Sequence, residues 1–109
     1  MNTAEWLMSW YFSNCNDDWE HQYGVKIDTI DNPGWVVTID LAGTDMEAYK
    51  FSRIDHNLDN SQLELARSAS WWSCRVEDLK FHAACGPKDL LSVLDIFQKW
   101  VSDVRDSSI

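Results

Sequence analysis

The chain has 109 residues, of which 45% are hydrophobic, and its formal net charge at pH 7 is −9. This length predicts a single domain over residues 1–109, because two smaller domains could not each bury a stable core. The negative charge repels phosphate backbones and no basic stripe is present, so nucleic acid is excluded as an expected partner.

A short helix is predicted over residues 4–12. Four large side chains at helical spacing form its apolar face: Trp6, Leu7, Trp10 and Tyr11. Asn2 and Glu5 have the spacing of a helix N-cap and its capping-box partner. Residues 14–20 then form a polar connection into the first strand.

Two antiparallel strands are predicted next, over residues 23–30 and 36–41. A register with Ile27 opposite Ile39 keeps the apolar side chains of both strands on one face. On the other face, this register predicts two further pairs: Lys26 with Asp40, and Asp28 with Thr38. The Pro-Gly dipeptide at residues 33–34 suits the centre of a type II turn, within a loop of about five residues.

Alternating patterns predict a third strand over residues 47–54 and a fourth over residues 71–76. Residues 55–70 are polar and ambiguous, and residues 62–67 could form a helical turn. After the fourth strand the apolar residues switch from even-numbered to odd-numbered positions, which predicts a bulge or break near Asp78. The strongest helix signal begins at Pro87 and carries a wide apolar stripe to about Arg105. The predicted fold is α+β: a four-stranded antiparallel sheet with an N-terminal and a C-terminal helix packed on one face.

Candidate metal ligands are scattered along the chain: Cys15, His21, Cys74, His82 and Cys85. Only His82 and Cys85 are close in sequence, whereas zinc sites favour two such pairs. The same two residues are the only local pairing of a base with a thiol, and nothing marks that thiol as activated. We therefore expect buried structural cysteines, no metal and no cofactor.

Acid–base catalysis is the next possibility, because Asp17, Asp18, Glu20 and His21 are close in sequence. Such chemistry needs shielded groups with shifted pKa values, whereas groups crowded into a polar loop are usually solvated. The sequence also has no phosphate-binding glycine loop, nucleophile elbow or HExxH motif. We therefore expect no enzyme activity.

Charge is unevenly distributed along the chain. Residues 1–47 hold nine carboxylates and one basic residue, Lys26, beside the aromatic residues Trp19 and Tyr23. Carboxylates among large rings favour a docking surface for a basic protein, whose association such a field accelerates. The candidate contact residues are Asp17, Asp18, Trp19, Glu20, His21, Tyr23, Asp28 and Asp40.

Two points remain open in this interpretation. Trp19 could be a hydrophobic plug beneath the polar loop or an exposed binding anchor, since interface hot spots favour tryptophan. The acidic loop could also serve solubility alone, in which case the contact surface would lie elsewhere, for example on residues 55–70.

Several motifs together resemble the immunity protein 53 family of bacterial polymorphic toxin systems. They are Trp10-Tyr11, Cys15, Asp18-Trp19-Glu20-His21, Tyr23-Gly24-Val25, Asp31-Asn32-Pro33-Gly34-Trp35, Ile39-Asp40-Leu41, Phe81, Gly86-Pro87, Leu90, Leu94, Phe97 and Trp100. The resemblance implies an immunity protein that binds and neutralises a cognate toxin, and it implies no catalytic residues. The acidic surface adds that this toxin is basic, as a nuclease would be.

Two other functions remain as alternatives: an interaction domain unrelated to toxins and, more remotely, a metal-binding enzyme. No apolar run approaches the roughly 18–20 residues of a membrane span. The first residues lack the basic and apolar regions of a signal peptide, and three cysteines are an odd number for a disulfide framework. We therefore expect a cytoplasmic protein with no membrane partner. The sequence predicts no particular oligomeric state.

Overall fold

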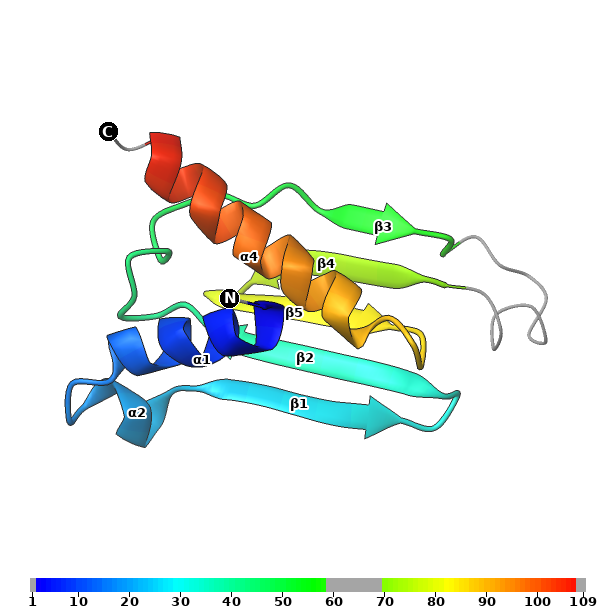
Figure 1. Cartoon of the computed structure of the whole chain (residues 1–109), viewed down its shortest axis with the longest axis horizontal. Coiled ribbons are helices and arrows are strands. Elements are labelled where there is room, and N and C mark those ends of the chain that lie inside the picture. Colours follow the sequence, from blue (N-terminus) through cyan, green and yellow to red (C-terminus); the bar gives the residue numbers. More distant parts are fainter. Residues whose placement is uncertain (1, 59–69, 108–109) are drawn as a thin grey trace.

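The computed structural model describes residues 2–58 and 70–107, which form one sheet covered on one face by two long helices (Figure 1). The elements in chain order are α1 (Thr3–Asn14), α2 (Trp19–Gln22), β1 (Val25–Ile30), β2 (Gly34–Asp40), β3 (Ile54–His56), β4 (Trp72–Glu77), β5 (Lys80–Cys85) and α4 (Leu90–Ser107). The strand order is β1-β2-β5-β4-β3, and each neighbouring pair is antiparallel. The predicted α+β class and helix-covered sheet are confirmed, but the sheet has five strands and not four.

Helix α1 begins as its sequence predicts. The Asn2 side chain accepts a hydrogen bond from the Glu5 backbone N–H at 2.8 Å and donates one to the Glu5 carboxylate at 3.0 Å. This pairing satisfies a backbone N–H that the first helical turn leaves without a partner. The helix runs two residues beyond the predicted end and buries Leu7 and Trp10 against the sheet.

The first hairpin forms, but its predicted register is wrong by two residues. Val25 pairs with Ile39, so Lys26 faces Thr38 and not Asp40. Asp28 likewise faces Val36, not Thr38. A shift of two residues leaves every side chain on its predicted face, so the hydrophobic pattern cannot distinguish the two registers.

The turn of this hairpin fixes the register. Gly34 belongs to β2 and pairs with Ile30, which leaves residues 31–33 as the loop. The predicted loop of about five residues, with a type II turn centred on Pro33 and Gly34, is therefore wrong. Gly34 is needed in the strand because a Cβ there would lie 2.2 Å from the Cys85 carbonyl oxygen.

The predicted third strand is mostly wrong, because β3 contains only Ile54–His56. The chain before it crosses the end of the core, where Met46 is fully buried and Phe51 packs against Phe81 and Trp100. The Trp100 indole N–H donates to the Lys50 carbonyl at 3.0 Å. These contacts replace the strand that alternation predicts. The predicted helical turn over residues 62–67 lies outside the described residues.

The break predicted near Asp78 is confirmed, and it is the turn of a hairpin. Asp78 and Leu79 both have positive φ angles, 54° and 58°, and they join β4 to β5. Positive φ at both central residues is typical of tight hairpin turns, but asparagine and glycine usually supply it, so the Asp-Leu pair gave no signal. Strand β5 was missed for a similar reason, because two alanines weaken its strand pattern.

Helix α4 begins at Leu90, three residues after the predicted start at Pro87. Asp89, just before it, is 5% exposed and accepts hydrogen bonds from the Ser70 hydroxyl at 2.9 Å and the Trp71 N–H at 3.1 Å. This buried carboxylate ties the start of the helix to the start of β4. The predicted apolar stripe is confirmed, and it buries Val93, Leu94, Phe97, Trp100 and Val101.

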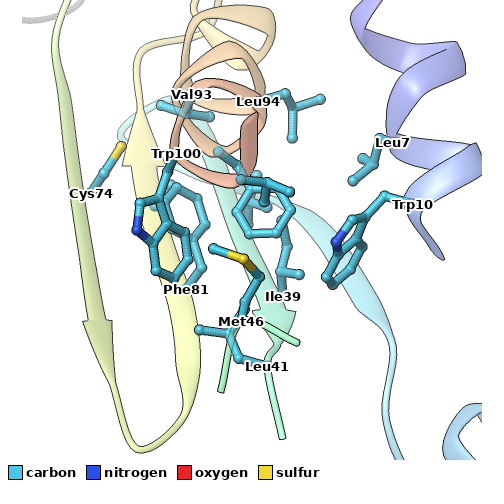
Figure 2. Packing of buried hydrophobic residues seen from close by; sticks show 14 of the residues in the cluster. Leu7, Trp10, Ile39, Leu41, Met46, Cys74, Phe81, Val93, Leu94 and Trp100 are labelled. Carbon is cyan, nitrogen blue, oxygen red and sulfur yellow. The ribbon is translucent and has the colours of Figure 1, made fainter. Parts of the chain in front are cut away.

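The core lies between the two helices and the covered face of the sheet (Figure 2). Phe97 is at its centre, with ring centroids 5.0 Å from Trp10 and 5.1 Å from Phe81. Such edge-to-face and tilted pairs add to the burial energy of large rings. The packing holds α1 and α4 side by side, and the C-terminal end of α1 lies near α2, beside the start of β1 (Figure 1).

Candidate functional site

The acidic loop between α1 and α2 is held by its own side chains. The Asn16 amide oxygen accepts from the backbone N–H groups of Asp18 at 3.0 Å and Trp19 at 2.8 Å. The two carboxylate oxygens of Glu20 accept hydrogen bonds from the backbone N–H groups of Asn16 and Asp17, each at 2.9 Å. The loop therefore has a fixed shape, and Asp17 adopts a left-handed φ of 70° within it.

The same bonds separate the roles of the three acids. Hydrogen bonds from the backbone N–H groups of Glu20 itself, Asn16 and Asp17 lower the pKa of the Glu20 carboxyl, so it stays ionised as the acceptor that shapes the loop. Asp17 and Asp18 are exposed, and Asp18 accepts a hydrogen bond from the Gln22 amide at 3.2 Å. Their charges therefore face solvent.

Trp19 lies beneath this loop and is only 4% exposed. Its indole N–H donates to the Ala42 carbonyl at 2.8 Å, and its ring packs edge-on against Trp10. Gly43 has a φ of 79°, and a Cβ there would lie 3.1 Å from the Trp19 ring. The structure thus decides between the two interpretations of Trp19: it is a plug, and the expectation of an exposed anchor is wrong.

A groove of about 570 Å³ opens between α1, α2 and the start of β1, and we call it the α1–β1 groove. It is lined by Leu7, Met8, Tyr11, Glu20, His21, Gln22, Tyr23, Gly24, Val25, Lys26 and Asp40. Met8, in the lining of the groove, is 64% exposed, and Phe12, four residues later on α1, is 78% exposed. Tyr11, Tyr23 and Ile27 are also exposed.

The structure brings four of the predicted contact residues to this groove: Glu20, His21, Tyr23 and Asp40. Asp40 is fixed there, because its carboxylate accepts from the Gly24 N–H at 3.0 Å. Asp17 and Asp18 are in the adjoining loop. Asp28 is further along β1, where its carboxylate accepts from the Thr29 N–H at 2.8 Å.

Sequence reasoning missed Met8 and Phe12. They stand four residues apart on α1, away from the face that carries Leu7 and Trp10, and so project together from the helix. An apolar pair at this spacing outside the core stripe was the available signal.

Comparison with known proteins identifies the family of this chain. The family model of immunity protein 53 matches residues 4–102. The chain belongs to the immunity protein 53 family. No curated protein and no solved structure gives a significant match. Membership in an immunity protein family indicates a role in neutralising a toxin and a protein toxin as partner.

The one local pairing of a base with a thiol in the sequence of this family member is not brought together. His82 and Cys85 are three residues apart on β5, so they lie on opposite faces of the sheet. Burial raises the pKa of the Cys74 thiol to about 12 and that of Cys85 to about 11, which keeps both protonated in the core. Within the described ranges 2–58 and 70–107, no group of three histidine, cysteine or acidic residues could hold a metal ion. None of the described helices has the length and apolar character to cross a membrane.

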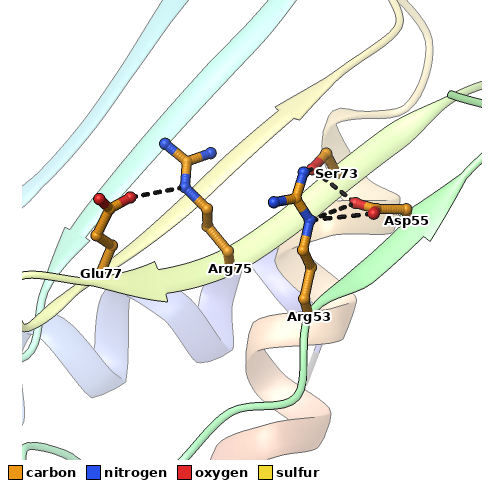
Figure 3. A network of polar contacts seen from close by, with 5 residues as sticks. All are labelled: Arg53, Asp55, Ser73, Arg75 and Glu77. Carbon is orange, nitrogen blue, oxygen red and sulfur yellow. Dashed lines mark hydrogen bonds and ion pairs between the residues drawn. The ribbon is translucent and has the colours of Figure 1, made fainter.

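The uncovered face of the sheet in this immunity protein carries paired charges (Figure 3). Asp55 accepts a hydrogen bond from the Ser73 hydroxyl at 2.8 Å and forms an ion pair with Arg53 at 3.0 Å. Both contacts lower the pKa of the Asp55 carboxyl, and the hydrogen bond from Ser73 has the larger effect. Arg75 forms an ion pair with Glu77 at 3.0 Å. The acids and bases of these two pairs neutralise each other, whereas the loop before α2 carries acids alone.

Proposed function

We propose that this chain neutralises its cognate toxin by stoichiometric binding, with the α1–β1 groove and the adjoining acidic loop facing the toxin. The observation that carries this proposal is the exposure of Met8 and Tyr23, which line the groove beside carboxylates. Phe12, one helical turn after Met8 on α1, extends this apolar surface. Family membership supports a protein toxin as the partner.

The apolar side chains supply the affinity in this proposal. Protein interfaces concentrate their binding energy in a few aromatic and large apolar side chains near the centre of the contact. Phe12 and Tyr23 can each bury roughly 150–250 Å² of ring surface. Met8, which is flexible, can adapt to the shape of the toxin.

The acids of the loop supply steering and order. Asp17 and Asp18 are exposed at the edge of the site, where such charges mainly raise the association rate with a basic partner. Trp19 packs beneath the loop, and Glu20 accepts hydrogen bonds from the loop backbone. The loop is therefore already ordered and loses little conformational freedom when the toxin binds. The preferred toxin is therefore a domain with a basic surface, such as a nuclease, whose substrate site is occluded.

We also place this encounter in the cytoplasm and assign the chain no enzymatic step. All three cysteines are free thiols, as is usual for proteins in reducing compartments. Neutralisation by occlusion needs only one bound immunity protein for each toxin molecule.

The test is the association rate with the catalytically inactivated toxin domain encoded beside the gene for this chain. Replacement of both Asp17 and Asp18 by asparagine should slow association about tenfold at low salt, and salt should diminish the difference. Glu20 is left intact because it shapes the loop. The matched control is Asp103→Asn with Asp106→Asn, which removes the same charge at the C-terminal end of α4.

Two results would count against this surface. Equal association rates for wild type and the Asp17/Asp18 variant at low salt would exclude the loop as the steering element. A toxin complex that survives Phe12→Ala and Tyr23→Ala with an unchanged dissociation rate would exclude the apolar surface as its anchor.

A further inference from the structure

Strand β1 is an open edge of the sheet. It pairs with β2 on one side, and the strand order places it at the end of the sheet (Figure 1). Its four central residues, 26–29, are all exposed. Proteins usually shorten or cover such an edge to prevent unwanted pairing. The opposite edge, β3, is only three residues long, whereas β1 has six.

The hydrogen-bond pattern shows which backbone groups point outward from this edge. The Asp40 N–H donates to the Gly24 carbonyl at 3.1 Å, so residue 24 faces β2. In an antiparallel ladder, hydrogen-bonded pairs alternate with pairs that are not hydrogen-bonded, so the backbone N–H and C=O groups of residues 26, 28 and 30 also point toward β2. The backbone N–H and C=O groups of Val25, Ile27 and Thr29 are therefore directed away from the sheet.

Thr29 gives independent support for this assignment. Its N–H donates to the Asp28 carboxylate at 2.8 Å and not to β2. Asp28 thus covers one outward donor near the end of the strand. No corresponding side-chain acceptor occupies the outward N–H groups of Val25 and Ile27 among the hydrogen bonds of the described residues.

The side chains beside these two free positions continue the α1–β1 groove. Val25 lines the groove, and Ile27 follows it on the same face of the strand with 41% of its surface exposed. In a strand added to this edge, every second side chain would lie beside Ile27 on the same face of the sheet and would enter the groove. The intervening side chains would lie on the other face, beside Lys26 and Asp28.

We propose that the toxin docks through a β-strand that pairs with the outer edge of β1 and inserts alternate apolar side chains into the α1–β1 groove. This inference rests on the proposed function and specifies how the partner is held. Main-chain hydrogen bonds to Val25 and Ile27 provide affinity, and the groove selects the side chains, as in other cases of strand addition.

The charge around the edge defines the partner strand further. Carboxylates lie along β1: Asp40 at its start, Asp28 within it and Asp31 in the loop that follows it. Asp17 and Asp18 add two more in the loop before α2. Lys26 is the only basic side chain of β1. The intervening residues of the toxin strand are therefore lysine or arginine. A second copy of this chain is a poorer occupant, because two chains of charge −9 would bring their acidic surfaces together.

Ile27→Pro tests the pairing directly. Proline removes an N–H that the β1–β2 ladder does not use, and proline is tolerated in edge strands at such positions. Ile27→Ala is the matched control, since it removes the side chain but keeps the N–H. With the inactivated toxin domain as the probe, we expect Ile27→Pro to bind at least about tenfold more weakly than Ile27→Ala, which corresponds to the loss of about one backbone hydrogen bond.

Amide hydrogen exchange on the wild-type chain gives a second measurement that does not depend on the folding of the proline variant. The Val25 and Ile27 amides should exchange rapidly in the free chain and at least about tenfold more slowly in the complex. The Lys26 amide, which faces β2, is the internal reference and should be protected in both states.

The outcomes separate the two proposals. Toxin binding with no added protection at Val25 and Ile27 overturns strand pairing and leaves the proposed function standing. Failure of the wild-type chain to bind the toxin domain overturns both. A dimer of the chain alone that Ile27→Pro abolishes would assign the edge to a second copy, which also overturns the inference.

Discussion

Replacement of Trp19 by alanine is expected to destabilise the fold substantially, because this residue is a buried plug and not a contact for the toxin. The variant removes a ring that packs against Trp10, Tyr11 and Tyr23, with centroid distances of 6.3, 5.8 and 6.3 Å. It also leaves the Ala42 carbonyl without the indole N–H that lies 2.8 Å from it.

The magnitude follows from these contacts. Removal of a buried large aromatic ring costs about 3–5 kcal/mol of unfolding free energy. Trp19 lies at the end of the core, where the loop can partly collapse into the space, so about 3 kcal/mol is expected. At roughly 4 °C per kcal/mol for a domain of this size, the melting temperature should fall by about 12 °C. Trp19→Phe keeps most of the ring, so it should cost only about 1 kcal/mol for the lost hydrogen bond.

Urea unfolding followed by far-ultraviolet circular dichroism is the assay, because that signal comes mainly from the backbone, whereas tryptophan fluorescence would change with the residue removed. The midpoint should fall while the slope with denaturant stays the same. Phe12→Ala is the matched control: this ring is 78% exposed, and its loss should change stability by at most about 0.5 kcal/mol. A cost below about 1 kcal/mol for Trp19→Ala, together with weaker toxin binding, would refute the assignment of Trp19 as a plug.

Three further predictions concern other buried or hydrogen-bonded groups. Asp89→Ala should cost about 1–3 kcal/mol in urea unfolding, because the part-buried hydrogen bonds from the Ser70 hydroxyl and the Trp71 N–H lose their acceptor; a cost near zero would contradict that role. Glu20→Gln should be less stable than wild type at pH 7. The folded state lowers the Glu20 pKa, so its stabilisation is present above the ordinary pKa of 4.5 and is lost as the pH falls through the lower native value. Stability curves of the two proteins should therefore converge below that pH, and a constant difference would contradict the linkage. A thiol reagent at pH 8 should modify Cys15 in the native chain, while Cys74 and Cys85 should react only after unfolding, because burial raises both pKa values to about 12 and about 11. Mass spectrometry counts the adducts, and a second adduct on native protein would be inconsistent with this burial.

Much of the local structure could be predicted because it depends on residues close in sequence. The capping box of Asn2 and Glu5 and the apolar stripe of α4 both form as their spacing indicates. The alternation of β1 and β2 also predicts the face that meets the core. Each of these features is a periodicity or a short-range hydrogen bond.

Contacts between distant segments could not be predicted in this way. Phe51 alternates as if in a strand, but its burial beside Trp100 bends the chain across the core instead. The groove is assembled from two helices and two strands, so no single segment of the sequence contains it. Met8 is an ordinary exposed residue on α1 until β1 is placed beside it.

By itself, the sequence determined the α+β class, the acidic N-terminal half and the identity of the capping and core residues, because these depend on composition and short-range spacing. Only the tertiary structure decided that Trp19 faces inward and that the outer edge of β1 stays open. The reason is physical: the carbonyl of Ala42 and the ring of Trp10 come from other segments, and without them nothing in residues 15–20 distinguishes a plug from an anchor.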